Sequence, residues 1–343
     1  MKHGNITYAK SLNKSLHDLI DKNDSVYLFG CDINDPYGGA FKVTKGLSTQ
    51  FPERVFSTPI SEAGIIGVAS GMAMRGLRPI VEIMFGDFLT LCTDQIVNHI
   101  SKFRWMYNNK VKVPIVIRTP MGGRRGYGPT HSQSIEKLFM GVPEIVILSP
   151  SNYHDPGNIL EKAVYDDSPV LFIESKYLYT RELKKPDENG SSGIFKVFLD
   201  ESEYYPNIVL SNNDFEDCEV TIIAYGGMIP FVEKAAEYLM IEEELSIEII
   251  IPSKITPFNY NICNNSLKKS GRVVIVEEGT LTNGWGAEVT SLIQEHYFNY
   301  LKCPIVRIAA KDMLIGSAKT LEEYVLPDDR DIINKIMECV IKG

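Results

Sequence analysis

Residues 54–67 read Arg-Val-Phe-Ser-Thr-Pro-Ile-Ser-Glu-Ala-Gly-Ile-Ile-Gly, and this stretch predicts a loop that leads into a helix. Pro59 fixes the approach, and Ser61 can act as the N-cap before a run of small and apolar residues. Glu62 then lies in the first helical turn, in apolar surroundings. One interpretation is an acid that the helix dipole stabilises by a few tenths to about 1 kcal/mol. The other is a carboxylate held against a ligand nitrogen, where a low dielectric strengthens the hydrogen bond.

Strands and helices alternate around this stretch. The apolar runs are separated by helical patterns at residues 9–20, from Ser61 onward and at 87–101. Such alternation predicts a parallel sheet wrapped by helices. We expect this first α/β domain to comprise residues 1–183. Its predicted strands are residues 26–30, 78–83, 113–118, 144–148 and 169–173.

Residues 184–217 differ in character, because they are rich in charges and turn formers such as Lys-Lys-Pro-Asp-Glu-Asn-Gly-Ser-Ser-Gly. We expect a linker with one short strand. A second strand and helix series then predicts a smaller α/β domain over residues 218–343. Both domains are expected to be doubly wound three-layer folds, which bind ligands outside the carboxyl ends of their strands. The second set of strands is predicted at residues 219–224, 246–251, 272–276 and 304–308.

The composition excludes several classes of protein. The chain has 343 residues, 44% of them hydrophobic, and a formal net charge of -9, which argues against nucleic-acid binding. No apolar run approaches the roughly 18 to 20 residues of a membrane span, and the N-terminus lacks a signal-peptide core, so we expect a cytoplasmic protein without a membrane partner. Six scattered cysteines contain no Cys-x-x-Cys pair, which indicates reduced thiols and no zinc site.

The common phosphate-binding motifs are missing. There is no P-loop signature, and Gly226-Gly227 after a predicted strand lacks the third glycine of a dinucleotide fingerprint. The stretch Gly279-Thr-Leu-Thr-Asn-Gly-Trp-Gly-Ala-Glu could hold an anion on its backbone amides, but a glycine-rich turn between strand and helix explains it more simply.

A glycine-rich loop carries His131. Four glycines fall within seven residues of Gly122-Gly-Arg-Arg-Gly-Tyr-Gly, and His131 follows shortly after them. A histidine titrates near neutral pH, so in such a loop it can transfer protons or bind an oxygen of an intermediate. The alternative is a hydrogen bond that stabilises the turn. The other five histidines are expected in structural or solvated positions.

The order of several motifs resembles the beta subunit of the thiamine-diphosphate-dependent decarboxylating component of 2-oxo acid dehydrogenase complexes, of pyruvate, branched-chain or acetoin type, in the transketolase-like superfamily. The resemblance covers nearly the whole chain, and Thr58-Pro-Ile-Ser-Glu together with His131-Ser-Gln is its most specific part. The motifs that carry it are Gly30-Cys-Asp-Ile, Thr58-Pro-Ile-Ser-Glu-Ala-Gly, Gly76-Leu-Arg-Pro-Ile-Val-Glu-Ile-Met, Phe88 with Asp94-Gln95, His131-Ser-Gln, Val276-Glu-Glu-Gly and Gly286-Ala-Glu.

The resemblance implies a pyrimidine-binding domain followed by a transketolase C-terminal-like domain. It implies that Glu62 hydrogen-bonds N1′ of the aminopyrimidine of thiamine diphosphate, and that His131 lies near the substrate and the incoming lipoyl group. It further implies that Ile60, Met84 and Phe88 flank the pyrimidine, whereas without the family these three would be plain core residues.

The diphosphate and Mg²⁺ call for a G-D-G motif followed some 25 to 30 residues later by Asn-Asn in this family. Here Gly86-Asp-Phe and Asn108-Asn109 differ in the third residue and in spacing. We therefore expect no metal ligand in this chain and an alpha subunit that binds both groups, in an α2β2 heterotetramer served by a lipoylated acyltransferase. The alternatives are a subunit of a split transketolase-like enzyme, of a non-oxidative decarboxylase, or a catalytically silent assembly module.

Three features depart from the family pattern. Cys31 stands where an acid is usual, which leaves Asp32 alone after the first strand. Arg124 and Arg125 add positive charge to the His131 loop, where they either select a substrate with an extra anionic group or are simply solvated. The segment 184–217 is longer than typical, and the 2-oxo acid itself stays open.

Overall fold

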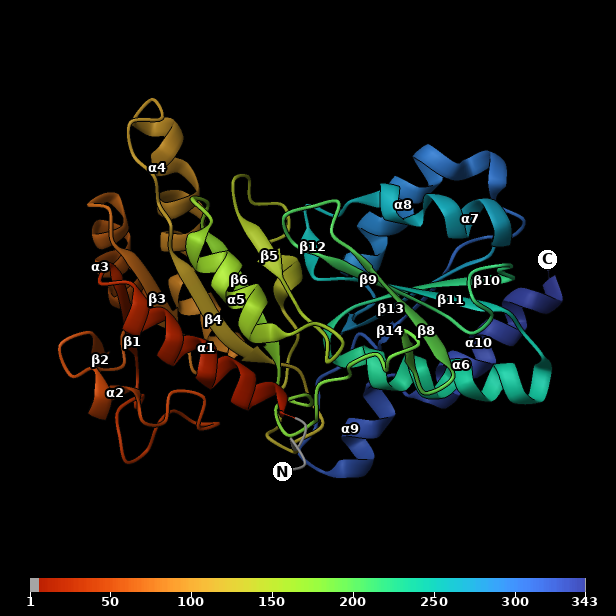
Figure 1. The fold of residues 1–343 in the computed structure, drawn as a ribbon, viewed down its shortest axis with the longest axis horizontal. Helices are drawn as coiled ribbons and strands as arrows, with labels where there is room; N and C mark the ends of the chain where they lie inside the picture. The colour runs from red at the N-terminus through yellow and green to blue at the C-terminus, as the bar shows by residue number, and fades with distance from the viewer. Residues whose placement is uncertain (1–5, 343) are drawn as a thin grey trace. The chain divides into compact units, whose positions relative to one another are not determined.

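The computed structural model describes residues 6–342, which form two units with separate β-sheets (Figure 1). The first unit comprises residues 6–121 and 138–183, and the second comprises residues 122–137 and 184–342. The expectation of an α/β protein with two domains is confirmed. Residues 1–5, where the sequence places the start of the first domain, lie outside the described residues.

The sheet of the first unit is built from parallel pairings in the order β5-β6-β4-β3-β1-β2. Gly30 at the end of β1 pairs with Ser57 on one side and Glu82 on the other, so the carboxyl ends of neighbouring strands meet at one edge. The sequence gives no signal for β2, because three residues are too few to show an alternation. The strands are β1 (Val26–Gly30), β2 (Val55–Ser57), β3 (Arg78–Glu82), β4 (Val116–Met121), β5 (Val146–Leu148) and β6 (Val170–Ser175).

Two helices of the first unit begin close to their predicted positions, α1 (Tyr8–Lys22) and α3 (Glu62–Met74). The helix expected over residues 87–101 is instead a 3₁₀-helix, η1 (Gly86–Cys92), a π-helix, η2 (Gln95–Ile100), and α4 (Ser101–Met106). Thr90 and Thr93 donate side-chain hydrogen bonds to backbone carbonyls of this segment, which competes with regular α-helical bonding. The first unit also contains α2 (Leu47–Gln50) and α5 (Pro156–Tyr165). The 3₁₀-helix η3 (Glu136–Leu138) falls in the sequence where residues 122–137 of the second unit end and residue 138 of the first begins.

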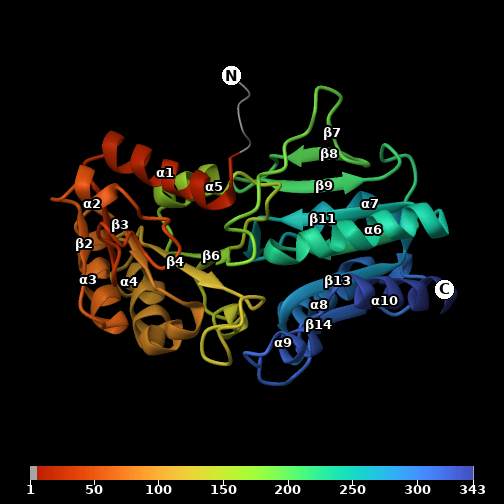
Figure 2. The same ribbon diagram turned by 90° about the horizontal axis from the view of Figure 1, so that it is seen from below.

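The second unit has a mixed sheet in the order β14-β13-β10-β11-β9-β8-β7. Its first four strands pair in parallel, whereas β9, β8 and β7 are antiparallel to their neighbours. Figure 2 shows β9 beside β11, and β8 on the other side of β9. The strands are β7 (Ser191–Ser192), β8 (Phe195–Asp200), β9 (Asn207–Ser211), β10 (Val220–Ala224), β11 (Ile247–Pro252), β13 (Val273–Thr280) and β14 (Val306–Ala310), with β12 (Lys254–Thr256) following β11.

Helices cover both faces of the second sheet. In Figure 1, α7 (Asn264–Ser270) and α8 (Trp285–Tyr297) lie above it, while α6 (Ile229–Glu243) and α10 (Asp329–Lys342) lie below and pack against each other. Within the described residues, no helix combines the length and the apolar character that a bilayer crossing requires. The described residues of this unit also include η4 (Gly226–Met228), η5 (Tyr260–Cys263), η6 (Phe298–Tyr300) and α9 (Lys319–Val325).

The segment 184–217 differs from its prediction as a linker with one short strand, because it contains β7, β8 and β9 and extends the second sheet. Every residue of β9 is buried, which its apolar Ile208, Val209 and Leu210 allow. In contrast, β8 lies near the sheet edge, where Phe195 is buried but Phe198 and Leu199 are exposed, so its residues do not alternate regularly between buried and exposed. Because turn-forming residues lie between these strands, the sequence of the segment resembles a linker.

Residues 122–137, the loop with His131, group with the second unit although they fall within the sequence range 1–183. Their hydrogen bonds explain this grouping. Gly123 N donates to Glu278, Arg124 N donates to Glu322, and Lys137 Nζ donates to Thr280 and Thr282. A loop between two strands of one sheet therefore has its polar partners in the other unit, which strand periodicity cannot indicate.

Candidate functional site

Glu62 lies at the carboxyl edge of the first sheet, where the chain leaves β2 and enters α3. The Ser61 side chain makes no N-cap hydrogen bond, so the expectation that it caps this helix is wrong. Its hydroxyl lies instead near Gly64, where a Cβ would approach Ser61 Oγ to 2.7 Å. The half-buried Glu62 carboxylate makes no hydrogen bond or ion pair with any group in residues 6–342. It is an acid without a polar partner at a helix start.

Two thiols report the charge of Glu62. Burial and then the negative charge of Glu62 raise the pKa of Cys92, at the end of η1, to about 12. The pKa of Cys31, directly after β1, is raised by burial and by the charges of Asp32 and Glu62. Glu62 is thus electrostatically coupled to the segments that follow β1 and β3. Both neighbouring thiols stay protonated at neutral pH.

The three apolar residues predicted beside the pyrimidine lie along the same edge. Ile60 follows β2 and is 80% exposed, while Met84 and Phe88 follow β3 and are half-buried. Gly86 permits this placement, because a Cβ there would lie 2.3 Å from Met121 Cγ of β4. An exposed isoleucine of this kind costs solvation free energy unless a ligand or partner covers it.

Phe88 is held by an aromatic cluster. Its ring meets Phe85 edge to face, with centroids 5.9 Å apart, and Phe85 in turn meets Phe41 at 5.8 Å. Phe41 packs on Tyr179 at 5.0 Å, and Lys176 Nζ lies 5.1 Å from the Phe85 centroid. These contacts fix the ring of Phe88 from one side.

A buried ionic network below this edge is absent from the sequence predictions. Arg118 of β4 donates from Nη1 to Glu82 Oε2 at 2.9 Å and from Nε to Glu174 Oε1 at 2.7 Å. Tyr179 OH also donates to Glu174, at 2.7 Å. The network joins β3, β4 and β6 near their carboxyl ends. A charged residue inside each of three apolar strand runs was the signal that could have revealed it.

His131 is half-buried in the second unit. Its Nδ1 lies 2.9 Å from Thr130 Oγ1, and its backbone N donates to Gly128 O at 3.3 Å. The adjacent Ser132 Oγ is buried and makes no hydrogen bond within the described residues. The predicted site residues therefore divide between the units: Ile60, Glu62, Met84 and Phe88 belong to the first, and His131 belongs to the second.

Two buried acids lie at the end of the His131 loop. Glu136 accepts a hydrogen bond from Tyr225 OH, and burial raises the pKa of Glu136. Glu277 of β13 accepts from Gly286 N at 2.9 Å, and burial followed by the charge of Glu136 raises its pKa to about 7. Thr282 N of the same stretch donates to Asp312 Oδ1 at 3.1 Å, so two amides of Gly279–Glu288 bind internal carboxylates. This supports the interpretation as a strand-to-helix turn.

Arg124 is part of the loop scaffold. Its guanidinium carbon lies 3.9 Å from the Phe231 centroid, and Nη2 donates to Pro327 O at 2.6 Å. Arg125 is exposed. Because internal partners already bind the Arg124 guanidinium, the structure does not support a role for Arg124 in selecting an anionic substrate.

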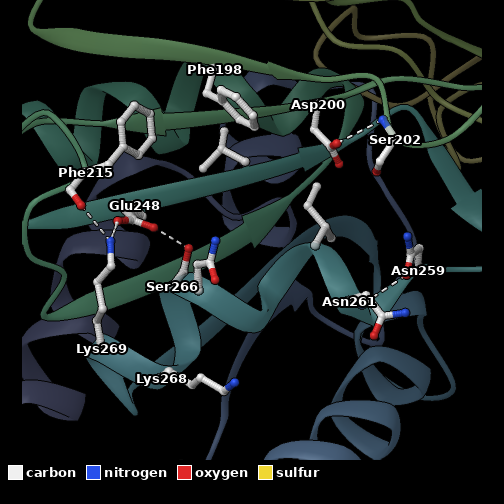
Figure 3. Close-up of a pocket in the computed structure, with 13 residues that line it drawn as sticks. Phe198, Asp200, Ser202, Phe215, Glu248, Asn259, Asn261, Ser266, Lys268 and Lys269 are labelled. Carbon is white, nitrogen blue, oxygen red and sulfur yellow. Dashed lines mark hydrogen bonds and ion pairs between the residues drawn. The ribbon is translucent and has the colours of Figure 1, made fainter.

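A separate cavity of about 630 Å³ lies in the second unit between β8, β9 and α7 (Figure 3). Phe198 and Phe215 meet there edge to face at 6.4 Å, and Lys269 binds Glu248 at 2.7 Å. None of the five predicted site residues lines it. The cavity is therefore distinct from the site described above.

Comparisons with known proteins match both units. Residues 4–182 match the family described as transketolase, pyrimidine binding domain, and residues 212–332 match transketolase, C-terminal domain. A split-gene transketolase, solved as an inactive beta4 tetramer, has a similar fold, with a TM-score of 0.73 at 21% identity over 98% of this chain and 99% of that one.

Relatives that match over nearly the whole chain define the family more narrowly. The beta-1 subunit of the mitochondrial pyruvate dehydrogenase E1 component from Arabidopsis thaliana is 36% identical, over 96% of this chain and 87% of the relative. The 2-oxoisovalerate dehydrogenase subunit beta of Pseudomonas aeruginosa is 36% identical, over 90% and 87%. The pyruvate dehydrogenase E1 subunit beta of Rickettsia bellii is 32% identical, over 98% and 99%. This chain belongs to the family of E1 beta subunits of the thiamine-diphosphate-dependent 2-oxo acid dehydrogenases.

Proposed function

We propose that this chain, together with an alpha subunit, decarboxylates a 2-oxo acid and passes the acyl group to a lipoyl carrier. The relatives are subunits of pyruvate and 2-oxoisovalerate dehydrogenases, which supports a substrate of one of these two kinds. The observation that carries the catalytic role is the Glu62 carboxylate, which is half-buried at a helix start and makes no hydrogen bond or ion pair within residues 6–342.

The residues at this edge fit the aminopyrimidine ring of thiamine diphosphate. Glu62 offers a carboxyl group to a ring nitrogen, N1′, and has no competing partner among the described residues. Ile60 and Phe88 offer apolar surface to the ring. This combination supports the assignment of Ile60, Glu62, Met84 and Phe88 to the cofactor.

Thiamine diphosphate, when bound, supplies the nucleophilic carbon and the electron sink for the loss of carbon dioxide. In our proposal Glu62 holds a proton at N1′, and the apolar residues around it exclude water, which strengthens that hydrogen bond. His131 positions and protonates oxygen atoms of the substrate and lies near the incoming lipoyl group.

The proposal assigns Mg²⁺ and the diphosphate to the alpha subunit, and the active site to an interface in an α2β2 assembly. This rests on the sequence, in which Gly86-Asp-Phe and Asn108-Asn109 do not form the family's diphosphate motif.

Reconstitution tests the proposal. The purified chain, its alpha partner and the mixture are each supplied with thiamine diphosphate, Mg²⁺, a lipoylated carrier protein as the oxidant and acyl acceptor, and either pyruvate or a branched 2-oxo acid, and carbon dioxide release is measured. We expect turnover by the mixture and none by this chain alone. Robust turnover by the pure single chain would contradict the shared site, and an inactive mixture would favour a silent assembly module.

A further inference from the structure

Two carboxylates of the second unit bind successive backbone amides of the His131 loop. Glu278 Oε1 accepts from Gly123 N at 2.6 Å, and Glu322 Oε1 accepts from Arg124 N at 2.6 Å. The same Glu322 oxygen is 3.3 Å from Arg125 N and 3.4 Å from Gly126 N. Hydrogen bonds from amides to an ionised carboxylate are roughly twice as strong as neutral ones. We name Glu278 and Glu322 the carboxylate clamp.

Burial of Glu322 and a glycine beside Glu278 adapt the carboxylate clamp to this loop. Glu322 is 5% exposed in α9, although its helix neighbour Glu323 is exposed and pairs with Lys319. Gly122 has a φ of +93°, and a Cβ there would lie 2.7 Å from Glu278 Oε1. The glycine-rich sequence therefore allows the backbone to approach the acids closely, which is a physical reason for glycine at this position.

The contacts continue to His131. A Cβ on Gly128 would lie 2.5 Å from Ser317 Oγ, so the loop runs directly against the segment before α9. Gly128 O then accepts from His131 N at 3.3 Å. Beyond His131, Lys137 Nζ donates to Thr282 O at 2.6 Å. The His131 backbone is thus held between two anchored segments.

We propose that Glu322, assisted by Glu278, is a positioning residue that fixes the His131 loop for the acyl-transfer chemistry. This inference rests on the proposed function for the role of His131, but the ordering of the loop does not depend on it. Neither acid is assigned contact with the substrate. Loss of Glu322 leaves the Arg124, Arg125 and Gly126 amides without their acceptor, and the loop gains freedom.

The first experiment measures loop order without any activity. Trypsin cleaves after arginine, so the peptide bonds after Arg124 and Arg125 report access to the loop in the full chain. We expect Glu322→Ala to be cleaved there about tenfold faster than the native chain, since local opening becomes easier. Glu322→Gln, which keeps an acceptor oxygen and the side-chain volume, should be intermediate and also serves if the alanine variant does not fold. Glu323→Ala is the matched control and should be cleaved at the native rate.

The second experiment asks whether Glu322 acts through His131. In the reconstituted complex, Glu322→Ala should lower kcat about tenfold or more, because a displacement of about 1 Å can cost up to 10²-fold. In a His131→Ala background the same change should cost less than about threefold, since coupled residues are not additive. Equal effects in both backgrounds, or native cleavage rates in Glu322→Ala, would overturn the inference. If the native complex shows no turnover, the proposed function fails while proteolysis still decides on the clamp.

Discussion

The Arg118 guanidinium donates two parallel hydrogen bonds to the Glu174 carboxylate, from Nε to Oε1 at 2.7 Å and from Nη2 to Oε2 at 2.9 Å. Both side chains are at most 1% exposed. This bidentate pair joins β4 to β6, and Nη1 of the same arginine binds Glu82 of β3. The strands that end at the candidate site are therefore tied together by buried charges.

Replacement of Arg118 by methionine should destabilise the protein by about 3 to 5 kcal/mol, because Glu82 and Glu174 would remain buried without their cation. Lys112→Met is the contrasting control, since Lys112 binds Asp167 at an exposed position and such pairs contribute roughly 0 to 1 kcal/mol. Urea unfolding of both variants gives the free energies. Equal losses would show that the buried network contributes no more than a surface pair.

The sequence was sufficient for most strands and helices of the two α/β units and for the place of Glu62 at a helix start, because apolar runs are local signals. It failed where partners are distant in the chain. Arg118 looks like an interruption of an apolar strand until Glu82 and Glu174 meet it in space. The loop before His131 takes its hydrogen-bond acceptors from Glu278 and Glu322, more than 150 residues away.

The Glu277 carboxyl should make stability depend on pH. Its pKa in the folded protein is about 7, above the ordinary value of 4.5, chiefly because of burial. The stabilisation by its protonated form is complete below pH 4.5 and is lost as pH rises through 7. Glutamine does not titrate, so the Glu277→Gln variant does not lose this stabilisation. The difference in free energy of unfolding between the variant and the native chain should therefore shift in favour of the variant by up to roughly 3 kcal/mol between pH 5 and pH 8.

Urea unfolding at several pH values between 5 and 8 measures this difference. Glu288→Gln, which removes an exposed acid from the same strand-to-helix region, is the control and should give a nearly constant difference. A Glu277→Gln difference that does not change with pH would show that Glu277 is ionised throughout this range.

Ile60→Asp should separate folding from cofactor binding. Ile60 is 80% exposed, so the change should alter the free energy of unfolding by no more than about 0.5 kcal/mol. If Ile60 flanks the ring as we propose, the thiamine diphosphate concentration for half-maximal activity of the complex should rise about tenfold or more, because a charge replaces apolar surface there. Ile341→Asp, at a 79% exposed position in α10, should leave that concentration unchanged. Similar responses of the two variants would remove Ile60 from the cofactor site.

His131→Ala should slow acylation of the lipoyl carrier by about 10²- to 10⁴-fold, the usual contribution of a group that transfers protons. His99→Ala is the matched control, because His99 is a half-exposed histidine stacked on Phe103. Carrier acylation by the reconstituted complex is followed for both variants. A loss of less than threefold in His131→Ala would place that histidine outside the reaction.

The most direct measurement is 2-oxo acid decarboxylation by the Glu62→Gln chain, reconstituted with its alpha subunit at saturating thiamine diphosphate. Glutamine keeps the shape of the side chain but removes the proton that our proposal places at N1′, so we expect kcat to fall by 10²-fold or more while the variant folds and assembles normally. Turnover within twofold of the native complex would contradict the central role of Glu62.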